Sequence, residues 1–126
     1  MISPETLKKQ TILLVEDDAI ARESWAIILR RMSAQVYEAA NGAEAIEIVE
    51  AHHPDLVITD LEMPVMGGME LIDRLKDAYP KLPIVVATAF DDEYHQTPRA
   101  DAVLVKPIEK SRLHEVLLQV ATDTQA

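Results

Sequence analysis

The candidate chemistry of this sequence centres on a carboxylate that follows an apolar run. Residues 56–58 are apolar, Asp60 comes directly after Thr59, and a loop containing Pro64 and the pair Gly67–Gly68 follows. A carboxylate at the carboxyl end of a buried parallel strand lies where open α/β sheets bind their ligands. A lone aspartate there is more often a polar strand end or a helix cap, so its interpretation depends on the other strands.

Three further apolar runs end in groups that complement this carboxylate: Glu16 and Asp17 after residues 12–15, Thr88 after 84–87, and Lys106 after 102–105. Converging carboxylates repel one another unless a cation or a proton relieves the repulsion. Mg²⁺ takes oxygen ligands in octahedral geometry and retains some of its waters. We therefore expect a magnesium site in which Asp17 and Asp60 bind directly and Glu16 binds through water.

Together these groups suit phosphoryl transfer to a carboxylate. Asp60 is ionised at neutral pH and needs no general base, so its attack on a phosphoryl group would produce an acyl phosphate. Mg²⁺ and Lys106 would neutralise charge on the transferring oxygens, and Thr88 would supply a hydroxyl. Taken singly, Lys106 is an ordinary surface lysine, Thr88 a strand-end hydroxyl, and residues 16–18 a solvated acidic strand end.

The alternation of apolar runs with helical periodicity predicts the elements that position these groups. Nearly continuous apolar strands indicate a parallel sheet covered on both faces, and right-handed crossovers place every carboxyl end at one edge. The sequence therefore predicts an α/β fold with strands near residues 12–15, 35–39, 56–58, 84–87 and 102–105, and helices near 19–32, 42–51, 69–79 and 109–122.

Caps and apolar positions refine the first two of these helices. Asp18 is placed to cap the helix at residues 19–32, and Asn41, with Glu44 three residues later, resembles the start of the next one. The apolar side of the helix at 19–32 is expected to consist of Ile20, Ile27, Ile28 and Met32, with Trp25 close to the same side.

Composition and chain ends limit the classes of function. The 126 residues fit one domain, expected at residues 11–122 between a flexible lead at 1–10 and a tail at 123–126. A net charge of −10 argues against direct nucleic-acid binding. The chain has no cysteine, no run long enough to span a membrane and no apolar signal-peptide core, so we expect a cytoplasmic protein.

Four motifs, in order along the chain, resemble those of the response-regulator receiver family. They are Leu-Leu-Val-Glu-Asp-Asp at 13–18, Thr-Asp-Leu-Glu-Met-Pro-Val-Met-Gly-Gly at 59–68, Ala-Thr-Ala at 87–89, and Val-Lys-Pro at 105–107. The resemblance covers roughly residues 10–122, and four motifs together are far more specific than any one. It implies a flavodoxin-like, doubly wound sheet of five parallel strands in the order 2-1-3-4-5.

The resemblance also implies a role for each site residue. Asp60 matches the phosphoacceptor, and Glu16 and Asp17 match the acidic pair that holds Mg²⁺, with Glu in place of the commoner Asp. The backbone carbonyl of Glu62 matches the remaining protein ligand. Thr88 matches the switch hydroxyl and Lys106 the phosphate-pairing lysine, with a cis bond expected between Lys106 and Pro107.

Partners follow from the same resemblance. The donor would be a phosphohistidine on a histidine kinase or a histidine phosphotransfer protein, because His52, His53, His95 and His114 are expected to be surface residues. A downstream protein, or an output domain beyond this chain, would respond. The chain would then be a signalling domain and not an enzyme, apart from promoting its own phosphorylation and dephosphorylation.

The sequence departs from the family pattern between the fourth and fifth strands. The family places an aromatic three residues before the lysine, where this chain has Val103. Only 17 residues separate Thr88 from Lys106, and Pro98 lies among them, which predicts a shortened or irregular fourth helix.

These departures leave two other functions open. One is a small Mg²⁺-dependent phosphatase with Asp60 as nucleophile and Glu62 as acid. The other is a receiver-like binding module that phosphorylation does not regulate. The complete set of acidic residues and lysine favours the phosphoacceptor over the binding module, whereas the short fourth-helix segment favours the binding module.

Overall fold

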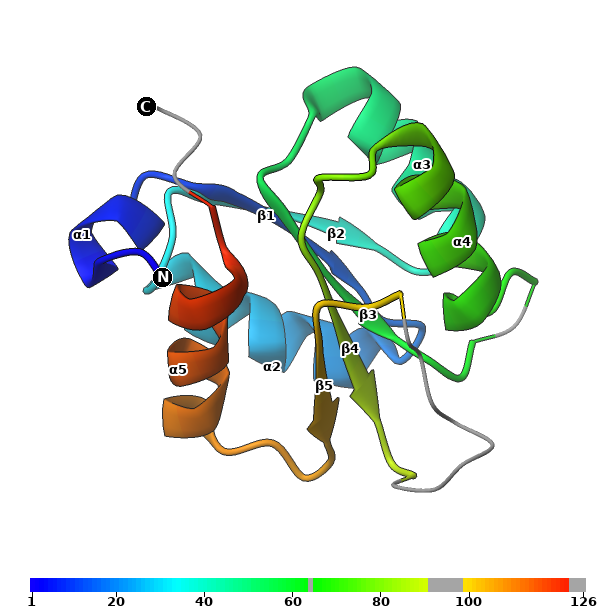
Figure 1. Ribbon diagram of the computed structural model, residues 1–126. Helices are drawn as coiled ribbons and strands as arrows, with labels where there is room; N and C mark the ends of the chain where they lie inside the picture. Colours follow the sequence, from blue (N-terminus) through cyan, green and yellow to red (C-terminus); the bar gives the residue numbers. More distant parts are fainter. Residues whose placement is uncertain (64, 91–98, 123–126) are drawn as a thin grey trace.

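The computed structural model describes residues 1–63, 65–90 and 99–122, and its strands form one parallel sheet (Figure 1). The sheet has five strands in the order β2-β1-β3-β4-β5, and each neighbouring pair is parallel. This confirms the expected α/β, flavodoxin-like arrangement and the strand order that the resemblance implied. The elements are β1 (Thr11–Val15), β2 (Gln35–Ala39), β3 (Leu56–Asp60), β4 (Ile84–Thr88), β5 (Ala102–Val105), α1 (Pro4–Leu7), α2 (Ala19–Arg30), α3 (Gly42–His52), α4 (Gly68–Ala78) and α5 (Lys110–Val120).

Helices cover both faces of the sheet, with α2 and α5 on one side and α3 and α4 on the other (Figure 1). Successive residues of a strand point to opposite faces, so each strand contributes to two separate cores. Leu14 belongs to the core under α2 and α5, whereas its neighbours Leu13 and Val15 belong to the core under α3 and α4. Packing on both faces fixes the strand ends relative to one another.

Helices α2 and α3 begin at the caps that the sequence predicted. The Asp18 carboxylate accepts hydrogen bonds from the amides of Ile20 and Ala21 at 2.9 and 3.2 Å. The Asn41 side chain accepts one from the Glu44 amide at 2.9 Å. Each such cap typically contributes about 1 kcal/mol to stability. The Asp18 cap also fixes the chain directly after the acidic pair that follows β1.

The buried face of α2 differs from the predicted one. Ile20 is 79% exposed and Ile27 is 49% exposed, so the expectation that these two residues face the core is wrong. The other expected residues, Trp25, Ile28 and Met32, do pack on the core. Leu29 joins them, so the core-facing positions Trp25, Leu29 and Met32 are spaced i, i+4 and i+7. Apolar residues surround much of this helix, so periodicity alone could not decide which side packs on the sheet.

The N-terminal residues are also more ordered than the sequence suggested. The expected flexible lead instead contains α1, whose N-terminus is capped by the Ser3 hydroxyl. Leu7 is completely buried, and the Ile2 amide donates to the Leu118 carbonyl of α5 at 2.9 Å. The local signal for this helix is Ser3 followed by Pro4, because a serine cap with proline at the first helical position is a common helix start. Figure 1 shows α1 beside α5.

Two other expectations fall on residues outside the described ones. The predicted short or irregular fourth helix would lie at residues 91–98, and the predicted tail at 123–126. In the following strand, β5, the side chains of Val103 and Val105 are each 41% exposed. Among the helices of the described residues, none has both the length and the apolar character needed to cross a membrane.

Candidate functional site

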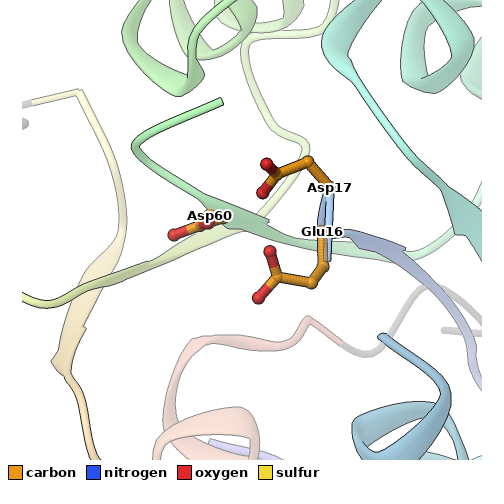
Figure 2. A group of neighbouring side chains, drawn as sticks. All are labelled: Glu16, Asp17 and Asp60. Carbon is orange, nitrogen blue, oxygen red and sulfur yellow. The ribbon is translucent and has the colours of Figure 1, made fainter. Parts of the chain in front are cut away.

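The carboxyl ends of β1 and β3 lie side by side and form the centre of the candidate site. Val15 pairs with Thr59 across these strands, so Glu16 and Asp17 leave β1 beside Asp60, the last residue of β3. Strand order reverses at this point, and open sheets leave a crevice for ligands there. One carboxylate oxygen from each of the three acids lies within 4.8 Å of the others, and the side chains project toward the same side (Figure 2).

Two of these three carboxylates are buried, which makes their charge costly. Glu16 is 6% exposed and Asp60 is 7% exposed, whereas Asp17 is exposed. Burial raises the pKa of Glu16, and the Asp60 carboxylate raises it further, to about 7. The cluster therefore favours an added positive charge, either a proton or a cation. Three carboxylate oxygens at an open sheet edge are a donor set that fits Mg²⁺.

Lys106, the residue directly after the edge strand β5, supplies a cation to the site. Its ammonium lies 3.2 Å from Asp60 Oδ1 and 3.4 Å from Glu16 Oε1. Partial burial alone would lower the pKa of Lys106, but the charge and hydrogen bonds of Asp60 and Glu16 outweigh it, so the pKa is raised. The Lys106 amide donates to the Thr88 carbonyl at 2.7 Å, and the Lys106–Pro107 bond is cis, as expected.

Thr88 has hydrogen-bond partners that the sequence did not suggest. Its side chain is fully buried at the end of β4, and its hydroxyl donates to Glu62 Oε1 at 2.7 Å. The Thr88 hydroxyl oxygen in turn accepts a hydrogen bond from the Phe90 amide at 3.1 Å. From the sequence, Glu62 is expected only to bind Mg²⁺ through its backbone carbonyl or, in the phosphatase alternative, to act as an acid. The available signal was an acid just beyond β3 and a hydroxyl at the end of the adjacent strand β4.

The loop after β3 is folded tightly against the residue at its start. The Leu61 amide donates to Asp60 Oδ1 at 3.0 Å and so helps to orient that carboxylate. The Gly68 amide donates to the Leu61 carbonyl at 2.9 Å and closes the loop. A Cβ atom on Gly68 would lie 2.5 Å from the Asp60 carbonyl oxygen, whereas one on Gly67 would have no atom of the described residues nearer than 3.9 Å. Of these two adjacent glycines, Gly68 is therefore the one that must lack a side chain.

The three histidines that the structure describes do not join this site. His52 stacks on Tyr37 with 4.3 Å between the ring centres, and His53 lines a separate cavity of about 410 Å³. His114 lies on α5 facing a different hollow, and His95 falls outside the described residues. The sequence-predicted residues that the structure brings together are therefore Glu16, Asp17, Asp60 and Lys106, with Thr88 linked to Glu62 at the next strand end.

Comparison with known proteins adds independent information. The response regulator receiver domain family matches residues 12–118. The autoinducer 1 sensor kinase/phosphatase LuxN of Vibrio campbellii is 32% identical to this chain over 110 residues. That match covers 85% of this chain but only 13% of the length of LuxN. The polar-differentiation response regulator DivK of Brucella ovis is 26% identical over 114 residues, covering 86% of this chain and 93% of DivK.

Solved structures show the same fold. The crystal structure of the N-terminal domain of an uncharacterized protein from Wolinella succinogenes superimposes with a TM-score of 0.80 and 35% identity. The superposition covers 88% of this chain and 93% of that domain. The match over residues 12–118, together with the shared sheet order, establishes that the chain belongs to the response regulator receiver domain family of two-component signalling.

Proposed function

We propose that Asp60 accepts a phosphoryl group from a phosphohistidine in a Mg²⁺-dependent reaction, and that the chain signals through the resulting change at Thr88. The main support is the setting of Asp60. Its carboxylate is buried, lies 3.2 Å from the Lys106 ammonium, and shares a cluster with Glu16 and Asp17. Such a site contains a nucleophile, a fixed cation and oxygen ligands for a second cation. Membership in the receiver family supports the same assignment.

In the proposed reaction, an Asp60 carboxylate oxygen forms a bond to phosphorus while the bond from phosphorus to the donor imidazole nitrogen breaks. The imidazole keeps the electron pair of the broken bond and leaves as histidine after protonation. Lys106, already beside Asp60, would pair with a phosphoryl oxygen. Mg²⁺ would be held by Asp17, Asp60 and the Glu62 carbonyl, with Glu16 acting through water, and would neutralise further charge on the phosphoryl oxygens.

The partners belong to the proposal as well. A histidine kinase or a histidine phosphotransfer protein would supply the phosphoryl group, and a downstream protein or output domain would respond to it. The added phosphoryl group brings negative charge and strong hydrogen-bond acceptors. Thr88, at the end of the neighbouring strand, would donate a hydrogen bond to it, and its movement would alter the chain that follows β4.

Acetyl phosphate provides the test. With Mg²⁺, the wild-type chain should gain the mass of one phosphoryl group, and Asp60→Asn should not, because its amide is a poor nucleophile. Trp25 is the only tryptophan and lines a cavity of about 30 Å³ together with Asp60 and Lys106, so its fluorescence should report Mg²⁺ binding. No mass gain at saturating donor and Mg²⁺ would reject the proposal.

The same samples separate the two alternative functions. A phosphatase would turn over a generic phosphate ester with many cycles per chain, whereas a phosphoacceptor gains one phosphoryl group per chain and does not turn over the ester. A binding module without regulation would keep its partner affinity unchanged in Asp60→Asn. In the structure the Glu62 carboxylate accepts a hydrogen bond from Thr88, which gives the phosphatase alternative no specific support.

A further inference from the structure

The Glu62 side chain makes a contact that the proposed phosphoryl transfer does not use. Its Oε1 atom lies 2.7 Å from the Thr88 hydroxyl oxygen, the usual distance for a well-formed O–H···O hydrogen bond. Thr88 is fully buried, whereas Glu62 is an exposed residue, so an exposed carboxylate reaches inward to hold a buried hydroxyl. Hydrogen bonds to an ionised acceptor are stronger than neutral ones.

A hydroxyl has a single proton to donate, and this fact makes the contact exclusive. In the structure, the Thr88 hydroxyl donates to Glu62 and accepts from the Phe90 amide at 3.1 Å. To donate to a phosphoryl oxygen on Asp60, Thr88 must give up its bond to Glu62. The Glu62 carboxylate and the phosphoryl group are both negative, so no second proton is available to bridge them.

We propose that the Glu62 side chain is a positioning residue that holds Thr88 in the unphosphorylated arrangement and thereby sets how readily the phosphorylated arrangement forms. This inference rests on the proposed function, because it presumes a phosphoryl group on Asp60. Two negative groups compete for one proton, and whichever binds Thr88 determines where the hydroxyl points. The Glu62 backbone carbonyl, the expected Mg²⁺ ligand, is unaffected by changes in its side chain.

The contact also links the site to the chain beyond β4. The Phe90 amide donates to the same Thr88 oxygen, and Phe90 itself is 45% exposed. When Thr88 turns from Glu62 toward Asp60, this amide must move with it or lose its hydrogen bond to the Thr88 hydroxyl. The amide resonance of Phe90 therefore reports whether the Thr88 hydroxyl donates to Glu62 or to a phosphoryl oxygen on Asp60.

A double-mutant cycle on beryllofluoride affinity tests the proposal, with Mg²⁺ present throughout and Glu62→Ala and Thr88→Ala as the two changes. Glu62→Ala should tighten beryllofluoride binding by on the order of tenfold, as expected when a charge-assisted competitor is removed. Loss of one negative charge alone would also tighten binding, but that effect persists in the Thr88→Ala background. The proposal requires the gain to be clearly smaller in Thr88→Ala, and restored in Thr88→Ser, which keeps a hydroxyl.

A spectrum without any phosphoryl mimic completes the test. In Glu62→Ala the Phe90 amide resonance should move part of the way toward its position in beryllofluoride-bound wild type, and Glu62→Gln, which keeps an acceptor oxygen, should move less. Equal gains in the Thr88 and Thr88→Ala backgrounds, or an unmoved Phe90 resonance, would overturn the role of Glu62 while leaving phosphoryl acceptance intact. Failure of wild type to bind beryllofluoride would instead overturn both proposals.

Discussion

At the scale of single residues, most of the candidate site could be predicted because its members each end an apolar run. Glu16, Asp17, Asp60 and Lys106 meet as expected from parallel strands whose carboxyl ends share one edge. The Glu62–Thr88 hydrogen bond could not be predicted. It depends on the path of a loop, and sequence spacing does not show which of several nearby polar groups a loop side chain will reach.

The raised pKa of Glu16 predicts a pH dependence of stability. The folded chain binds this proton more tightly than the unfolded chain, whose value is about 4.5, because the folded pKa is about 7. The proton therefore stabilises the folded chain fully below the unfolded pKa of 4.5, and this stabilisation is lost as the pH rises through the folded pKa of about 7. Without metal, the melting temperature of wild type relative to Glu16→Gln should therefore fall between about pH 4.5 and pH 7.

Thermal melts in EDTA across this pH range measure the effect, and the Glu16→Gln variant cancels contributions from other groups. Mg²⁺ should oppose the loss at neutral pH, because it replaces the proton as the neutralising charge. A difference between wild type and Glu16→Gln that stays constant from pH 4.5 to 7 would contradict the assignment of a raised pKa to this residue.

At the scale of elements, the central strands β1, β3 and β4 were predictable because a strand buried on both faces is an uninterrupted apolar run. The phase of α2 was not, since isoleucines lie on both its inner and outer sides and only contact with the sheet selects between them. Ile20 and Ile27 therefore face solvent, against expectation. Gly67 and Gly68 predict a loop between β3 and α4, but the sequence does not distinguish their roles. Those roles depend on how closely the backbone of Asp60 and Leu61 approaches each glycine.

The two adjacent glycines of this loop make a matched pair of variants. Gly68→Ala would place a Cβ 2.5 Å from the Asp60 carbonyl oxygen and 2.7 Å from the Leu61 Cα, so the backbone must shift. Within the part of the chain that the structure describes, the Cβ of Gly67→Ala meets no atom nearer than 3.9 Å. We expect Gly68→Ala to lower the free energy of unfolding by about 1–3 kcal/mol and Gly67→Ala to change it by less than about 0.5 kcal/mol.

Urea unfolding measures both variants. Because Gly68 touches the backbone of the proposed phosphoacceptor, Gly68→Ala should also slow phosphorylation of Asp60, whereas Gly67→Ala should not. Similar unfolding midpoints for the two variants would show that the loop is not held against Asp60 as the structure has it.

At the scale of the whole molecule, alternating strands and helices predicted the fold class, while the strand order came from the family resemblance. Composition could not predict that α1 closes one end of the core. That end is held by Leu7, which is fully buried, and by the hydrogen bond from Ile2 to Leu118 at 2.9 Å. Residues counted as a lead thus belong to the folded unit.

Truncation of one side chain tests this larger unit. Leu7→Ala should lower the free energy of unfolding by about 2–5 kcal/mol, as for other fully buried leucines. The exposed neighbour Lys8→Ala serves as the control and should change it by less than about 0.5 kcal/mol. If Leu7→Ala behaved like Lys8→Ala in urea unfolding, the first ten residues would be the flexible lead that the sequence suggested.

The fluorine NMR spectrum of beryllofluoride added to the chain tests the central claim most directly. The account predicts a bound resonance that requires Mg²⁺ and is absent in Asp60→Asn, because the carboxylate of residue 60 must complete the beryllium coordination. A bound resonance that survived Asp60→Asn, or a wild-type spectrum showing only free fluoride species at saturating Mg²⁺, would contradict it.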